Sequence, residues 1–188
     1  MVQRRPKTPD TTSKKSPDLQ VSAPPVLFRG EDNETYESLR DAFLADLAPQ
    51  SAYERSLVED LINLEWEKFR HRRLRDRLIL NAARKEAARA LDPASTAFGA
   101  LEGPSADARL KAEAFVGPAP VARQMIVDEL REVNREPDEI IALAYQAVSE
   151  AVSVHERKLA EIEGRLRRLM RDIQDLRASR AQLVEPAK

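Results

Sequence analysis

The sequence predicts an all-α protein, an elongated helical hairpin or bundle with a long, coiled-coil-like C-terminal helix and a disordered N-terminal tail. A heptad of apolar residues runs from residue 141 to residue 183, and no stretch alternates apolar and polar residues long enough to form a strand. Charged residues make up 34% of the chain and aromatic residues 5%. This composition is typical of charge-rich helices around a thin core.

The first segment, residues 1–25, is basic and rich in proline, serine and threonine, and it has few large aliphatic side chains. Ordering a residue costs about 1–2 kcal/mol, which so little apolar surface cannot offset. We therefore expect a disordered tail.

Residues 26–136 are expected to form a helical region. A short helix begins at Asp32 or Asn33, whose side chains can accept hydrogen bonds from free backbone amides, and Pro49 ends it. Ser51 and Glu54 then have the spacing of a capping box.

The helix that follows the capping box is predicted to run over about residues 51–91 and to stop before Asp92-Pro93. Its first half carries a clear apolar face, formed by Leu57, Val58, Leu61, Ile62, Trp66 and Phe69. We interpret Trp66 as a core residue.

A connector rich in proline and glycine is expected over about residues 92–120, with a short helix within it from Ser105 to Phe115. A further helix fits residues 121–133. Pro137 suits the first turn of a last helix over residues 137–185, where Asp138 and Glu139 complement the helix dipole.

The most regular pattern of the sequence is a heptad stripe of thirteen positions, eleven of them apolar. We name it the heptad stripe: Ile141, Tyr145, Val148, Val152, His155, Leu159, Ile162, Leu166, Leu169, Ile173, Leu176, Arg180 and Leu183. Only His155 and Arg180 are polar. A helix with one apolar stripe needs a partner along it. The partner is a second copy of the helix or the helix over 51–91 folded back antiparallel; we favour the hairpin and expect oligomerisation as well.

The residues just after the apolar face are unusually basic. Residues 31–67 have a charge balance of −9, and residues 68–89 one of +7. At about 100° per residue, five arginines surround the helix: Arg70, Arg72, Arg73, Arg75 and Arg77. They are candidates for binding anions, above all phosphate. The alternative, which we favour, is that they pair with carboxylates such as Glu132, Glu136 or Glu161.

Several kinds of active site are absent from the sequence. The chain has no cysteine, no phosphate-binding loop and no metalloprotease or nucleophile-elbow motif. His71 and His155, the two histidines, stand 84 positions apart, and Glu67 with His71 reads as a surface contact. We expect no enzyme activity and no cofactor. No apolar run has the length of a membrane span and no signal sequence is evident, so we expect a cytoplasmic protein without membrane contact.

A quarter of the chain, about residues 26–75, resembles a group of short, uncharacterised bacterial proteins. The residues that carry the resemblance are Leu27 to Asp32, Tyr36-Glu37, Leu39, Leu47 to Pro49, Glu54, Leu57 to Asp60, Leu64, Trp66 and Arg70 to Leu74. The C-terminal helix is similar in character. The resemblance implies a bacterial, intracellular protein and carries no activity, cofactor or site.

The sequence therefore favours a non-enzymatic scaffold that acts through self-association or by docking a protein partner along the heptad stripe. The alternative is a nucleic-acid-associated protein that uses the basic segment 68–89 together with the basic N-terminal tail.

Overall fold

The computed structural model describes residues 25–28, 30–92 and 103–184, with side chains as far as residue 182. These residues form helices and no strand. The helices are α1 (Asn33–Leu47), α2 (Ala52–Ala90), α3 (Ala106–Val116), α4 (Pro120–Glu132) and α5 (Pro137–Val184). Except for Pro25, the tail predicted over residues 1–25 lies outside the described residues, as does the 93–102 part of the expected connector.

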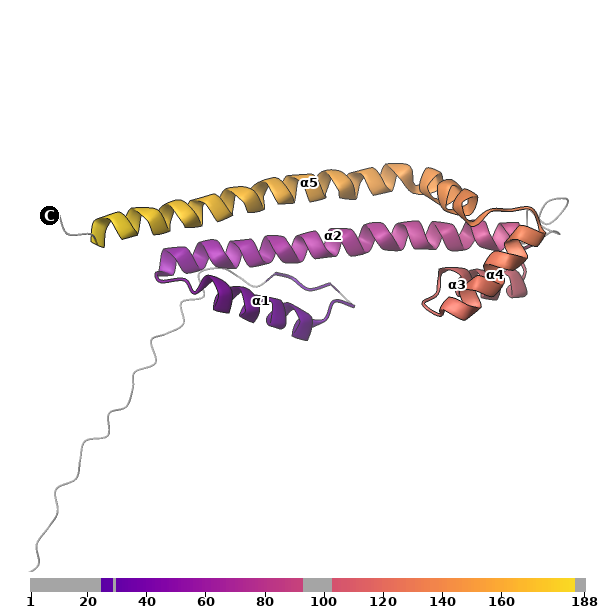
Figure 1. The fold of residues 1–188 in the computed structure, drawn as a ribbon, viewed down its shortest axis with the longest axis horizontal. Helices are drawn as coiled ribbons and strands as arrows, with labels where there is room; N and C mark the ends of the chain where they lie inside the picture. Colours follow the sequence, from indigo (N-terminus) through magenta and orange to yellow (C-terminus); the bar gives the residue numbers. More distant parts are fainter. Residues whose placement is uncertain (1–24, 29, 93–102, 185–188) are drawn as a thin grey trace, which may run out of the picture.

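Two long helices, α2 and α5, define the molecule. They lie side by side and antiparallel along most of their length, as the predicted helical hairpin requires (Figure 1). On the side of α2 away from α5, α1 lies along its first part, while α3 and α4 form a pair at its far end. The all-α hairpin predicted from the sequence is confirmed.

The ends of the first two helices follow from their capping residues. The Asp32 carboxylate accepts hydrogen bonds from the amides of Glu34 and Thr35 and so caps α1. At the start of α2, the Ser51 hydroxyl accepts from the Glu54 amide at 3.2 Å. The Glu54 carboxylate accepts from the Gln50 amide at 2.9 Å and not from that of Ser51, one residue away from the standard capping box.

Glu54 is fully buried at the junction of α1, α2 and α5. Arg177 Nε donates to its Oε1 at 2.6 Å, and Arg180 Nη1 donates to its Oε2 at 3.2 Å. The Gln50 amide lowers the pKa of Glu54 most, and the two arginines add to the effect against the opposing effect of burial. Arg180, a polar break in the heptad stripe, is thus the partner of a buried carboxylate.

The larger hydrophobic core lies where α1, α2 and α5 meet. Its buried members are Tyr36, Val58, Leu61, Ile62, Leu64, Trp66, Ile162, Leu166 and Ile173. Trp66 packs edge to face on Tyr36, with ring centroids 5.4 Å apart, so it is a core residue as predicted. Phe69, expected on the same face, is 47% exposed.

A second core joins the end of α2 to α3, α4 and the start of α5. It is formed by Ala87, Ala88, Leu91, Ala108, Ala112, Phe115, Ile126, Leu130 and Ile140. Between the two cores, α2 and α5 meet through three alanines, Ala82, Ala83 and Ala144. Side chains this small let the two helix backbones approach closely at this point.

Candidate functional site

The heptad stripe faces α2 over its C-terminal two thirds. From Val152 onward, the buried residues of the stripe are Val152, Leu159, Ile162, Leu166 and Ile173. Val148, His155, Leu169, Leu176 and Arg180 are half-buried, and the side chain of Leu183 lies outside the described ones. Within the hairpin, α2 therefore occupies the surface that the sequence offered to a partner.

The stripe departs from the prediction at its N-terminal end. Ile141 and Tyr145 are 37% and 44% exposed, whereas Ile140 and Ala144, each one residue earlier, are buried. The reason is the changed surroundings: Ile140 joins the core with α3 and α4, and Ala144 meets the alanines of α2. The core-facing side of α5 is thus rotated by about one residue in this segment.

The start of α5 is left with exposed large apolar side chains, which we name together the α5 apolar surface: Ile141, Leu143, Tyr145 and Val154. At about 100° per residue, Ile141 and Tyr145 share one side of the helix, and Leu143 and Val154 lie on roughly the opposite side. Residues 140–154 contain one charged residue, Glu150, so the helix is apolar on nearly every side here. A shallow hollow of about 520 Å³ lies along the same segment, lined by Gln146 to Ala151 and Val154, and of the four large exposed residues only Val154 lines it. A helix that is apolar all round is usually buried.

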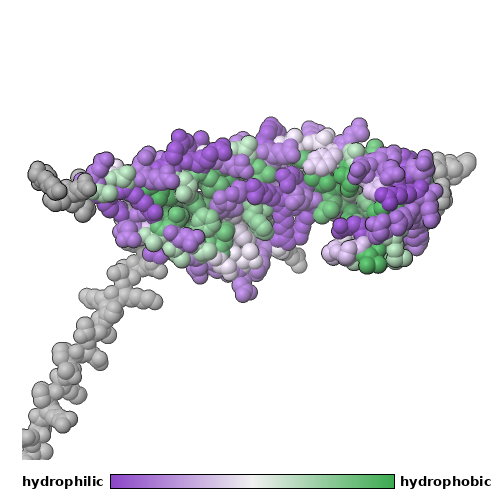
Figure 2. Space-filling view, in the orientation of Figure 1, coloured by the Kyte–Doolittle hydropathy of each residue, from purple (hydrophilic) through white to green (hydrophobic). Residues whose placement is uncertain are grey.

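Hydrophobic surface is unevenly distributed over the face drawn in Figure 2. It gathers along the line where α2 and α5 meet and on the underside of the α3–α4 pair, while hydrophilic residues cover most of the rest (Figure 2). Exposed apolar residues of α3 and α4 are Leu110, Val121 and Met125.

Two of the five arginines proposed as anion ligands hold the segment before α1. Arg70 donates to both oxygens of Glu31, at 2.6 Å and 2.8 Å, and lies 4.3 Å over the ring of Phe28. Arg73 donates to the Gly30 carbonyl at 3.3 Å. The hydrogen bond from Arg70 is the main cause that lowers the pKa of Glu31 to about 2.

The other three arginines differ in their surroundings. Arg72 pairs with Glu163 of α5 at 3.4 Å, and Arg75 with the neighbouring Asp76 at 2.8 Å. Arg77 is exposed and makes no ion pair with a described residue. Glu136 and Glu161, expected as partners, pair elsewhere, with Arg131 and Lys158. The arginines point to different elements and do not converge on one site.

A different set of cations converges at the corner of α2 and α3. Arg84, Lys85, Arg89 and Arg109 line a groove of about 500 Å³ together with Ala88, Pro104 and Glu113. Arg84 pairs with Glu113, and Arg89 with Glu86. Lys85 and Arg109 have no acidic partner among the described residues. Three of these cations belong to the basic segment that the sequence singled out, but not to its five arginines.

The structure also brings together the two histidines, which sequence reasoning left apart. His71 of α2 and His155 of α5 lie across the hairpin from each other, with their Nδ1 atoms 2.9 Å apart. The signal that brings them near each other is the antiparallel register: with Glu54 beside Arg177, residue 71 falls opposite residue 160, within about five residues of His155. Within the described part of the chain, no three or more His, Cys, Asp or Glu residues are grouped to hold a metal ion.

None of the described helices combines the length and the apolar character needed to cross a membrane. The chain matches no family model, no curated protein and no solved structure, so the resemblance of residues 26–75 to a bacterial group stays an expectation.

Proposed function

We propose that the protein is a non-enzymatic helical scaffold that docks another protein chain through the α5 apolar surface. The observation that carries the proposal is the exposure of Ile141, Leu143, Tyr145 and Val154 on a segment with a single charge. Exposed large apolar side chains on a segment poor in charge indicate an interaction site, because interface centres are depleted of charged residues.

The proposal differs from the sequence-based expectation in the surface that it uses. The rest of the heptad stripe packs on α2, and opening the hairpin to free it would expose buried residues such as Ile162 and Ile173. The start of α5 can be covered without that cost. The occupant is a second copy of this chain or a different protein, as the sequence left open, and we place both in a bacterial cytoplasm.

A pair of substitutions tests the proposal. Leu143→Glu together with Val154→Glu adds charge to the α5 apolar surface without touching the cores, and we expect it to abolish self-association or partner capture. Ala160→Glu with Ala178→Glu is the matched control, because both alanines are exposed on the charged part of the same helix.

The measurement has two parts, sedimentation equilibrium over a range of concentrations and pull-down with tagged protein from the native cell. Circular dichroism verifies that both variants stay helical. Unchanged association or capture in the Leu143→Glu, Val154→Glu variant would contradict the proposal.

A nucleic-acid function is the second candidate, and the groove between α2 and α3 is the observation that favours it. Lys85 and Arg109 face this groove without acidic partners among the described residues, and Arg77 lies exposed two turns earlier on α2. Replacing these three residues by glutamate should remove any binding to DNA or RNA whose affinity falls steeply with salt. Arg70 and Arg73 are unsuitable for this test, because they hold the segment before α1.

A further inference from the structure

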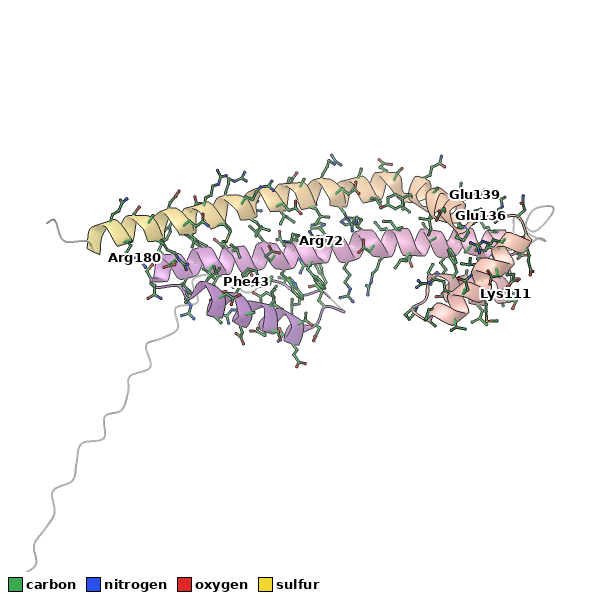
Figure 3. The ribbon with its side chains drawn as sticks, in the orientation of Figure 1. Phe43, Arg72, Lys111, Glu136, Glu139 and Arg180 are labelled. Atoms are coloured by element: carbon green, nitrogen blue, oxygen red, sulfur yellow. The ribbon has the colours of Figure 1, made fainter. Side chains whose placement is uncertain are left out.

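The only two histidines of the chain meet across the hairpin. The Nδ1 atoms of His71 and His155 are 2.9 Å apart, and the rings lie with centroids 5.2 Å apart at an interplanar angle of 54°. Both side chains are half-buried. His71 lies in the middle of α2, between the part that α1 covers and the part that α3 and α4 cover. Figure 3 labels Arg72, the residue that follows His71.

The chemistry of this contact limits how many protons it can hold. Two Nδ1 atoms at hydrogen-bond distance need one N–H and one lone pair between them, so one ring is protonated on Nδ1 and the other on Nε2. A first added proton goes to the free Nε2 of the donor ring, and the bond between the rings becomes charge-assisted. A second added proton has to occupy the accepting Nδ1, which turns two N–H groups and two positive charges toward each other.

The surroundings make the doubly protonated state unfavourable. Around His71, the carboxylate of Glu67 favours a positive charge, whereas Arg70 and Lys158 oppose it. Burial is the main cause that lowers the pKa of His71, and the charge of His155 acts in the same direction. Further charged residues within a few positions on the two helices are Lys68, Arg72, Arg73, Arg75, Asp76, Glu156, Arg157 and Glu163, and Glu31 pairs with Arg70.

We propose that the His71–His155 pair is a proton-operated latch in the hairpin. The latch holds α5 against α2 while the pair carries no added proton or one, and it releases the middle of α5 when both imidazoles are protonated. Opening exposes Val152, which is buried beside the pair and adjoins the α5 apolar surface. The inference stands on the geometry of the pair and does not depend on the proposed docking function.

The sign of the pH effect follows from proton uptake. In an open hairpin each imidazole binds a proton with an ordinary pKa of about 6.5. The closed hairpin binds fewer protons below that pH, so its stability is complete above about pH 6.5 and falls as the pH drops through it. This window lies above the range in which carboxylates titrate.

NMR titration tests the coupling directly, because the protein gives only two sets of imidazole signals. We expect the two rings to titrate in two linked steps, the second at a pH below the ordinary value. In His71→Gln, the remaining His155 should titrate in a single step, and the converse holds for His155→Gln. Arg77→Gln, at an exposed position without an ion pair to a described residue, is the control and should leave both steps unchanged. Two independent single-step titrations, each unaffected by loss of the other histidine, would overturn the proposal.

A distance measurement tests the opening itself, and the absence of native cysteine makes labelling simple. Spin labels at Arg77→Cys and Ser153→Cys report on the middle of the hairpin, and labels at Ala52→Cys and Ala178→Cys report on the end with the larger core. From about pH 7.5 to about pH 5, with a chelator present, the first distance should lengthen and the second should stay constant. The double variant His71→Gln, His155→Gln should abolish the change. A constant first distance in the parent chain, or the same lengthening in the double variant, refutes the latch.

Discussion

Two carboxylates, Glu31 and Glu54, connect parts of the chain that are far apart in sequence. Glu31 binds Arg70 of α2, and Glu54 binds Arg177 and Arg180 of α5. Charge-assisted hydrogen bonds of this kind are stronger than neutral ones and fix the geometry of both partners. Through them, single residues set where the segment before α1 lies and how α5 aligns with α2.

The lowered pKa of Glu31 predicts how the protein responds to acid. Because the folded value is about 2, below the ordinary value near 4.3, this carboxylate adds stability above about pH 4.3 that is lost as the pH falls toward 2. The shift corresponds to about 3 kcal/mol. Urea unfolding at a series of pH values measures it, and Glu31→Gln should flatten the dependence in this range. An unchanged slope in that variant contradicts the assignment.

For individual side chains, the sequence identified the unusual arginines and histidines more readily than the residues that they contact. The alternative in which the arginines pair with carboxylates describes Arg70, Arg72 and Arg75, but their partners Glu31, Glu163 and Asp76 are not among the acids considered. Arg73 donates to the Gly30 carbonyl instead. Long side chains reach several elements, so charge alone does not select one carboxylate. The contact between His71 and His155 was not predicted for a similar reason. It depends on the register of the hairpin, which the ion pairs of Glu54 and the cores set.

At the scale of elements, the heptad predicted α5 and its pairing with α2, because a repeated apolar stripe has few ways to be buried. At Ile141 and Tyr145 the stripe does not pack on α2, and the structure exposes both side chains. The cause lies on the partner helix: Ala82 and Ala83 present a surface so small that Ala144, not Tyr145, fits against it. The apolar pattern of one helix does not reveal how much space the side chains of the facing helix leave for it.

The close approach at these alanines predicts sensitivity to added volume. Ala83 is fully buried, and Ala83→Leu should destabilise the fold by about 1–3 kcal/mol, because α2 and α5 must move apart. Ala160→Leu, on the exposed side of α5, should change stability by no more than about 0.5 kcal/mol. Chemical denaturation compares the two variants. Equal effects would show that the helices are not closely packed there.

A substitution at Gly164 should instead make the fold more stable. It lies inside α5, and a Cβ added there would have only the flexible end of Arg168 as a neighbour, at 3.9 Å. Gly164→Ala should raise the free energy of unfolding by about 0.5–1 kcal/mol, because alanine restricts the unfolded chain and favours the helix. The same denaturation experiment reports it, and a loss of stability would mean that the position needs the glycine.

The described part of the whole molecule has two large cores at opposite parts of one hairpin. Between them lie the alanine cluster, the histidine pair and the buried Val152 and Leu159, which belong to neither core, so we expect the two parts to open with different free energies. The sequence predicted the hairpin but not this division, because the division depends on which side of α2 the three short helices cover.

A cavity in the second core tests the division. Leu130 is fully buried there, and Leu130→Ala should destabilise that core by about 2–5 kcal/mol. Hydrogen exchange should then accelerate in α3, α4 and the end of α2, while residues 58–66 keep most of their protection. Uniform acceleration throughout α2 would instead indicate a single cooperative unit.

The pairing of two long helices has a consequence for how the size of the protein is measured. At about 1.5 Å per residue, the 48 residues of α5 extend for roughly 70 Å. A particle of 21.2 kDa with this axial ratio experiences more friction than a sphere of equal mass and elutes early from a gel-filtration column. Calibration against globular standards would therefore overestimate the mass of a monomer, so the elution volume alone does not count the copies.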